Sequence, residues 1–413
     1  MKITNRFHYG WVIVIVSFLG MMSWAMGRTL YPYVLPTMEA ELNLAHVSMG
    51  SISSAYFITY TITTFVWGII TDRIGARKCM LIGAVIIILG LSGMGFMSSL
   101  TSGWLSYSLC GVGTAGLVIP IVRLVSGWFS GVRRGMALGI TMSGVGTATL
   151  LLGFVIPMIL ASYSWRWSWW VGATFVLVVA AIGWFVLIDN PTNRSLAPIQ
   201  TNTEEFAASQ KQHMKENPER IEPKVTLKDI LKRGTVWNLA GVYGTYGMGE
   251  VTFMTFTVAY LQEIGWGVQV AAGVFATWAA VSISGPLISG TIADYLPKKY
   301  LLAMLAALMG AGMLIFLSGS TAAYYIGAAM VGFVAPSLPT VMAASMADYH
   351  DPRVIGTTFG FVTLFLGMGG IIGPTLGGAL GDATGTLSTA ILLSSGISFL
   401  SFVLALVLKK PAK

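Results

Sequence analysis

The chain has 413 residues, of which 55% are hydrophobic and only 10% are charged, and its formal net charge is +8. Soluble domains carry about 25% charged residues, so this composition argues against a soluble enzyme or binding module and indicates a polytopic membrane protein. The positive charge does not indicate a nucleic-acid partner, because the basic residues gather in loops on one side of the predicted membrane segments.

Apolar segments fill most of the chain, and each is long enough to cross a hydrocarbon core of about 30 Å as a helix. We therefore predict an all-α membrane protein with twelve transmembrane helices. The predicted segments are residues 9–36, 47–71, 79–99, 103–129, 135–161, 164–188, 236–261, 267–292, 300–318, 321–346, 355–381 and 384–408.

One extended polar stretch, residues 189–235, separates the first six segments from the last six. It predicts a cytoplasmic linker between an N-terminal half, residues 1–188, and a C-terminal half, residues 236–413. Lys and Arg concentrate in this stretch and in the loops on the same side of the membrane, which predicts that both termini are cytoplasmic in a cell (inner) membrane protein.

The two halves repeat at a nearly constant offset. Gly68 and Asp72 follow the second segment, and Gly290 and Asp294 follow the eighth segment 222 residues later. Parallel six-helix repeats of this kind build a large class of secondary transporters. The repeat predicts two pseudo-symmetric halves.

Three charged side chains, Arg28, Arg123 and Glu250, lie inside the apolar segments, and the repeat offset places Arg28 and Glu250 at equivalent positions of segments 1 and 7. Burying a charge in a membrane bundle costs several kcal/mol, which favours a functional role. Arginine binds carboxylate, sulfonate or phosphate through a planar fork, and a buried glutamate can carry a proton. The pattern predicts an anion-binding carrier in which Arg28 and Arg123 hold the anion and Glu250 couples its movement to protons.

Structural roles for the same charges stay open. Arg28 and Glu250 can form an ion pair that joins the halves, and Arg123 can extend its head group to the membrane interface or pair with the loops there. Four aromatic residues lie one or two turns from the buried charges and are candidate substrate contacts or plain helix packing: Trp24, Tyr31, Tyr243 and Tyr246.

The sequence carries no signal for a metal site, a cofactor or a catalytic nucleophile. Cys79 and Cys110 fall in or beside predicted segments and form no disulfide framework. No histidine lies in the middle of a segment beside a candidate nucleophile, which argues against an enzyme.

The loop Gly68-Ile-Ile-Thr-Asp72-Arg-Ile-Gly-Ala-Arg77-Lys78 resembles the signature loop of the major facilitator superfamily, and its weaker second copy lies at the matching place in the other half. The resemblance covers the whole chain and implies the twelve-helix fold of that family. It also implies that Asp72, Arg73, Arg77 and Asp294 act as a conformational latch rather than as substrate contacts.

Two branches of the superfamily are similar in detail. Arg28 late in segment 1, and Arg123 five residues before Trp128-Phe129 in segment 4, resemble the anion:cation symporters, although Gly27 replaces the acid that often precedes the first arginine there. The opening Phe7-His8-Tyr9-Gly10-Trp11 resembles the monocarboxylate and oxalate/formate carriers.

Together these patterns predict a secondary active transporter of a small organic anion, a carboxylate or sugar acid, by alternating access and proton-coupled symport. Its expected partners are the anion, a proton or another cation, and membrane lipid, and we expect a monomer. The alternatives are a drug/cation–proton antiporter and an organophosphate or anion exchanger of the same fold, and, from another class, a receptor that binds an anion without moving it.

Overall fold

The protein is represented by a computed structural model that describes residues 8–129, 132–189, 233–293, 295–349 and 355–408. The polar linker therefore lies almost entirely outside the described residues, as does Asp294. In these ranges the chain is helical and holds no strand.

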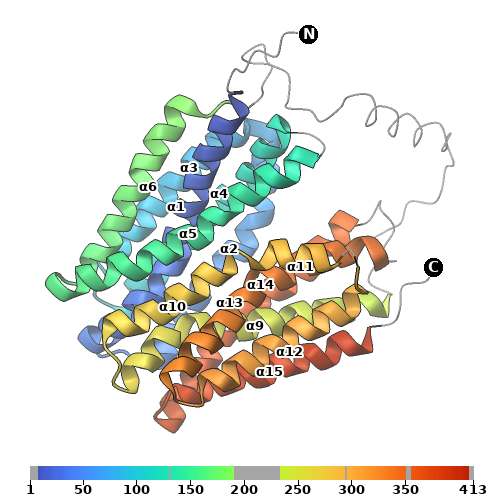
Figure 1. The fold of residues 1–413 in the computed structure, drawn as a ribbon. Helices are drawn as coiled ribbons and strands as arrows, with labels where there is room; N and C mark the ends of the chain where they lie inside the picture. The colour runs from blue at the N-terminus through green and yellow to red at the C-terminus, as the bar shows by residue number, and fades with distance from the viewer. Residues whose placement is uncertain (1–7, 130–131, 190–232, 294, 350–354, 409–413) are drawn as a thin grey trace, which may run out of the picture.

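The N-terminal half is a bundle of long helices, drawn from blue to green in Figure 1. Each helix corresponds to one of the first six predicted segments, with ends that differ by a few residues. The helices are α1 (Gly10–Leu42), α2 (His46–Ile74), α3 (Ala76–Gly95), α4 (Leu100–Trp128), α5 (Val132–Ser162) and α6 (Arg166–Val186).

The C-terminal half is a second bundle, drawn from yellow to red in Figure 1. Its helices are α9 (Gly234–Glu263), α10 (Val268–Ser282), α11 (Gly285–Ala293), α12 (Lys298–Phe316), α13 (Thr321–Tyr349), α14 (Ile355–Thr384) and α15 (Ser388–Val407). Ten segments of the described chain are long and apolar enough to cross a membrane by length and composition, with α10 and α11 counted as one. The helices α2 and α9 fall outside that set, because α2 is rich in Ser and Thr and α9 is rich in Thr, Tyr and Gly.

The eighth predicted segment differs from a continuous helix. It is interrupted by a turn at Ile283 and Ser284, where α10 ends and α11 begins. Pro286 follows directly, and because proline has no backbone N–H, the carbonyl of Ser282 has no i+4 donor there. Pro286 accounts for this local break, and α10 and α11 together still run the full length of the bundle.

The halves contact each other mainly through two equivalent helix pairs, α2 with α14 and α5 with α10, and also through α1 with α9. A Cβ at Gly146 of α5 would lie 2.7 Å from the Ile283 side chain, and a Cβ at Gly367 of α14 would lie 2.3 Å from the Thr61 hydroxyl. In the repeat, Gly146 corresponds to Gly367, 221 residues later, and Thr61 corresponds to Ile283, 222 residues later. Because the repeat offset recurs in contacts between the halves, the pseudo-symmetry is a property of the packing as well as of the sequence.

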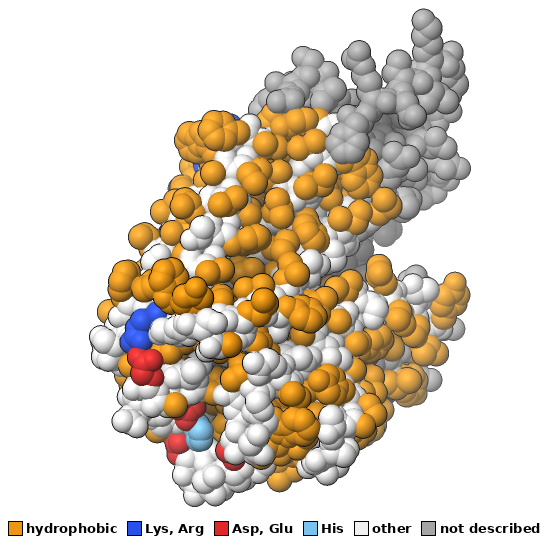
Figure 2. Space-filling view, turned by 60° about the vertical axis from the view of Figure 1, so that its left-hand side comes forward, with side chains coloured by type: hydrophobic (Ala, Val, Ile, Leu, Met, Phe, Trp, Pro, Cys, Tyr) orange, Lys and Arg blue, Asp and Glu red, His pale blue; other side chains and the backbone are white. Residues whose placement is uncertain are grey.

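The contacts between the halves gather at one end of the bundle. We call this the contact end; it carries the loop at residues 43–45 and the turn at residues 385–387. The halves diverge toward the other end, where α1 begins and α15 ends, and we call it the linker end (Figure 1). In Figure 2 a group of charged side chains lies at one end of a surface that is otherwise largely hydrophobic.

Candidate functional site

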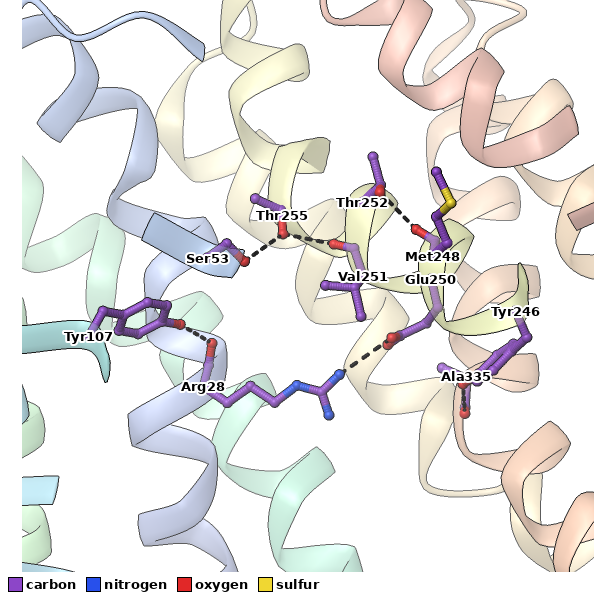
Figure 3. Close-up of polar contacts among 10 residues, drawn as sticks. All are labelled: Arg28, Ser53, Tyr107, Tyr246, Met248, Glu250, Val251, Thr252, Thr255 and Ala335. Atoms are coloured by element: carbon purple, nitrogen blue, oxygen red, sulfur yellow. Dashed lines mark hydrogen bonds and ion pairs between the residues drawn. The ribbon is translucent and has the colours of Figure 1, made fainter. Parts of the chain in front are cut away.

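Arg28 and Glu250 meet between the two halves. The Nη2 atom of Arg28 on α1 donates to Oε2 of Glu250 on α9 at 3.3 Å, and the two side chains point toward each other across the interface (Figure 3). The Arg28 side chain is 21% exposed and that of Glu250 is 6% exposed. The pair is therefore largely withdrawn from solvent, but the arginine stays accessible.

This ion pair joins residues that the repeat makes equivalent, since they lie 222 residues apart. Two equivalent residues can touch in a two-fold arrangement only close to the symmetry axis. The pair therefore marks the pseudo-two-fold axis of the protein, where both halves contribute to one site. Any rotation of one half against the other changes this contact directly.

The Arg28 guanidinium is held between two aromatic rings. Its Cζ atom lies 5.2 Å from the ring centroid of Trp24 on α1 and 5.4 Å from that of Phe57 on α2. Cation–π contacts of this kind stabilise a cation that has lost part of its hydration. The backbone beneath is fixed as well, because the Tyr107 hydroxyl of α4 donates to the Arg28 carbonyl at 3.0 Å.

Arg28 keeps donors for a further acceptor. Its contact with Glu250 is long and uses one nitrogen, and within the described chain the buried Nε has no hydrogen-bond partner. A buried donor without an acceptor is costly, so this corner of the site suits an anion that accepts hydrogen bonds.

The predicted tyrosines have different surroundings. Tyr31 donates to the Met49 carbonyl at 2.7 Å and stacks on Tyr107, so its hydroxyl and ring are both engaged inside the N-terminal half. Tyr246 donates to the Ala335 carbonyl, and its ring stacks on Tyr243. Of the four predicted aromatic residues, Trp24 is the one with a direct contact to Arg28.

Phe57 and Tyr60 of α2 were not among the predicted site residues. Phe57 faces the Arg28 guanidinium, and the Tyr60 ring lies 6.5 Å from that of Trp24. The predicted site residues lie on segments 1, 4 and 7 alone, which left segment 2 out. The aromatic cluster Tyr56-Phe57 with Tyr60, one turn apart, was the available signal.

Arg123 lies on α4 at a different depth. A Cβ at Gly27 would lie 2.6 Å from the Thr114 side chain, which fixes Thr114 beside Arg28. Arg123 is nine residues farther along α4, and nine helical residues span about 13 Å. Its side chain is exposed. In this conformation Arg123 is displaced from Arg28 toward the linker end.

The same contact gives a physical reason for Gly27. An acid at this position would need the space that the methyl group of Thr114 occupies. The Thr114 hydroxyl is itself hydrogen-bonded to the Tyr56 hydroxyl at 2.9 Å. The carboxyl group of this site therefore comes from Glu250 on the opposite half rather than from the residue before Arg28.

Of the predicted latch residues, Arg77 contacts its own half. Its backbone N–H donates to the Asp189 carboxylate at 2.7 Å, and its guanidinium donates to the Trp184 carbonyl. Arg73 is exposed in the last turn of α2. The Asp72 side chain and the whole of Asp294 lie outside the described residues, so the latch stays a prediction.

The described residues contain no group of three or more His, Cys, Asp or Glu side chains placed to hold a metal ion. Cys79 and Cys110 are both free and buried. The arrangement around Arg28 offers a fixed cation, a carboxyl group and aromatic walls, which can bind and release an anion.

The family model of the Major Facilitator Superfamily matches residues 13–335 and 287–413. The chain is 24% identical to the hexuronate transporter of Bacillus subtilis (strain 168), over 94% of this chain and 91% of that protein. It is also 24% identical to monocarboxylate transporter 13 of Rattus norvegicus, over 94% of this chain and 86% of that protein.

Solved structures share the fold at lower identity. The D-xylose–proton symporter has a TM-score of 0.76 at 12% identity, with 98% of this chain and 99% of that chain covered. A bacterial homologue of the human lysosomal transporter Spinster, in an inward-facing and unoccupied conformation, has a TM-score of 0.71 at 16% identity, with 98% and 96% covered. The chain belongs to the major facilitator superfamily and is a multi-pass membrane transporter rather than an enzyme.

Proposed function

We propose that the protein transports a small organic anion together with a proton, and that Arg28 binds the carboxylate of the substrate. The observation that carries this proposal is the Arg28–Glu250 contact, which joins the two halves on the pseudo-two-fold axis through one long hydrogen bond. Because this ion pair is buried and held by one long hydrogen bond, Arg28 can exchange the Glu250 carboxylate for that of a substrate.

The exchange has a simple charge balance. A substrate carboxylate that approaches Arg28 competes with Glu250 for the same guanidinium, and two carboxylates beside one cation repel each other. A proton on Glu250 removes that repulsion and leaves Arg28 to the substrate. The occupied site then carries the same net charge as the empty ion pair, so a monocarboxylate and a proton cross as a neutral set.

The two arginines then act in sequence. Arg123, which is exposed and displaced toward the linker end, attracts the anion electrostatically, while Arg28 binds it at the axis. With the linker on the cytoplasmic side, as the positive-inside bias predicts, this conformation is open to the cytoplasm. The opposite conformation opens the contact end and exposes the same site to the outside.

The relatives support an anionic substrate, since the named ones include a hexuronate transporter and a monocarboxylate transporter. Transport of a lipophilic cation is less favoured. In a cation exporter Glu250 would have to be available to the cation, whereas here the Arg28 guanidinium occupies its Oε2 atom.

The proposal is tested by ligand-induced stabilisation of the detergent-purified protein. The panel contains lactate, pyruvate, oxalate, glucuronate, glucose 6-phosphate and tetraphenylphosphonium, each at acidic and neutral pH. Binding raises the melting temperature by an amount set by RT ln(1 + [L]/Kd). We expect one class of organic anion to stabilise the wild-type protein and Glu250→Gln, and to have no effect on Arg28→Gln.

Arg166→Gln is the matched control, because Arg166 pairs with Glu41 at the contact end and the substitution removes the same charge. We expect this variant to keep the response to the anion. Stabilisation by the cation that persists in Arg28→Gln would contradict the proposal and favour an exporter built around Glu250. An anion response that survives in Arg28→Gln would contradict the assigned site.

A further inference from the structure

A cluster of ionisable side chains joins the two halves at the contact end, remote from the Arg28 site. Both carboxylate oxygens of Asp382, on α14, accept hydrogen bonds from the start of α2 in the other half. The donors are the backbone N–H groups of His46, at 2.9 Å, and of Val47, at 2.8 Å. The helix α2 has no cap of its own, since Ala45 precedes it without a side-chain hydrogen bond.

The contact is close as well as polar. A Cβ at Gly378 of α14 would lie 2.4 Å from the His46 carbonyl oxygen. A carboxylate at a helix N-terminus satisfies N–H groups that the helix itself leaves unpaired and is favoured by the helix dipole. Asp382 therefore holds α2 only while the contact end is closed, because the two belong to different halves.

The His46 side chain connects this cap to a second acid. Its Nδ1 atom forms an ion pair with Oε1 of Glu39 on α1, and the Glu263 carboxylate at the end of α9 also acts on it electrostatically. The groups that face the imidazole are thus Glu39 from α1, Asp382 from α14 and Glu263 from α9, all of them acids. One imidazolium among three carboxylates is attractive, whereas a neutral imidazole leaves the three acids to repel each other.

The pseudo-symmetry provides an internal comparison. The repeat offset places Val268 opposite His46 and Ala161 opposite Asp382 on the equivalent pair of helices, α5 and α10. That second pair packs through small and apolar side chains and has no such ionisable residues at these positions. The α5–α10 interface is therefore closed by packing, whereas the equivalent α2–α14 interface also carries a cluster of ionisable side chains.

We propose that His46, Glu39 and Asp382 form a second latch, separate from the predicted one at Asp72 and Asp294. This proton-sensitive latch holds the contact end closed when His46 is protonated. The latch is independent of which anion is carried. It makes the conformational equilibrium of the transporter depend on the pH at the contact end, in addition to any proton carried by Glu250.

The sign of the pH effect follows from the surroundings of His46, which is the first residue of α2 and lies outside the predicted membrane segment. The Glu39 carboxylate beside its Nδ1 atom raises the pKa of His46 above its ordinary value of 6.5 in the closed conformation. Protonation therefore favours closure fully at pH values below the ordinary pKa, and the effect is lost as pH rises through the raised pKa. Each unit of pKa difference corresponds to about a tenfold change in the open-to-closed ratio.

The test measures the width of the contact end against pH. Spin labels on cysteines at Ser98 and Ser318, both exposed at the contact end in different halves, report the distance between the halves. The background variant replaces Cys79 and Cys110 so that only the introduced thiols are labelled. In the labelled protein we expect the short distance to dominate at pH 5.5 and a longer one to grow several-fold by pH 8.5.

Three variants separate the latch from general effects of pH. His46→Gln and Glu39→Gln each remove the titrating pair while keeping a polar side chain, so we expect the pH response to disappear in both. Val268→His places an imidazole on the equivalent interface, which lacks the acids, and should leave the response of the parent unchanged. A parent distance that does not respond to pH, or a response that persists in both His46→Gln and Glu39→Gln, would overturn the proposal.

Discussion

The two ends of the bundle use glycine in opposite ways. At the contact end a Cβ at Gly50 of α2 would lie 2.1 Å from the Pro374 carbonyl oxygen in the other half. At the linker end of the same helix, Gly68 has no neighbour within 4 Å. Gly139 on α5 and Gly360 on α14 also have none. Glycine thus permits close backbone approach between the halves at the contact end, whereas Gly68, Gly139 and Gly360 have open space beside them.

One sequence can serve two conformations because glycines are placed at both ends of the bundle. Glycine allows helix backbones to approach closely in a membrane, and at the contact end that property is in use. Gly68 and Gly290 are equivalent in the repeat, and neither touches the other half in this conformation. Glycines at the linker end that touch nothing here would allow the helices to approach closely when that end closes. This arrangement fits alternating access about the Arg28–Glu250 pair.

The largest expected effect comes from filling the close approach. Gly50→Ala would place its methyl group against Pro374 and force a backbone shift, which costs about 2 kcal/mol for an overpacked site. Gly68→Ala makes the same change on the same helix in open space and should stabilise α2 by about 1 kcal/mol, since alanine favours helix. We expect a lower melting temperature and greater labelling of cysteines at the contact end for Gly50→Ala alone. Equal behaviour of the two variants would contradict the comparison.

A smaller effect is expected from a hydroxyl that bridges the halves. Ser54 on α2 hydrogen-bonds to the Ile371 carbonyl at 2.5 Å and to the Thr375 hydroxyl at 2.8 Å, both on α14. Ser54→Ala should cost about 1 kcal/mol, as for other hydrogen bonds between membrane helices, and favour opening of the contact end.

The matched control for Ser54 is Thr59, also on α2. Its hydroxyl donates to the Ser108 carbonyl at 2.8 Å, inside the N-terminal half. Thr59→Val should lower the melting temperature without changing the distance between labels at Ser98 and Ser318. A change of that distance in Thr59→Val, but not in Ser54→Ala, would show that the bridging bond does not favour closure.

The smallest expected effect concerns two acids that the repeat makes equivalent, Glu41 and Glu263. Glu41 accepts from the Trp165 indole at 2.9 Å and pairs with Arg166, while Glu263 accepts from the Leu387 N–H at 2.9 Å. An exposed ion pair contributes less than about 1 kcal/mol and is screened by salt. We expect Glu41→Gln to lower the melting temperature slightly at low salt and less at high salt, and Glu263→Gln, which breaks no ion pair, to show a weaker salt dependence.

The fold was predictable because long apolar segments and a repeat at constant offset can be recognised in the sequence without knowing which helices pack together. The same offset predicted that Arg28 and Glu250 are equivalent, and the structure brings them into contact. The turn at Ile283 was missed because a single proline in an apolar segment bends some helices and interrupts others, depending on packing.

The missed site residues share one physical cause. Phe57 on α2 faces Arg28 on the preceding helix, and Asp382 caps α2 from the other half, so both contacts depend on how separate helices pack. Periodicity in the sequence shows which residues share a helix face but not which helix that face meets. Tyr31 illustrates the converse, since it lies one turn from Arg28 in the sequence while its hydroxyl is donated to Met49.

The most direct test of the account uses the purified protein in liposomes with the anion identified by the stabilisation panel. Two modes are compared, accumulation driven by a proton gradient and exchange of anion against anion at equal pH. We predict that Glu250→Gln retains exchange and loses accumulation, because a neutral side chain cannot release a proton, while Arg28→Gln loses both. Accumulation that survives in Glu250→Gln, or exchange that survives in Arg28→Gln, would contradict the central claim that one ion pair binds the anion and couples its movement to protons.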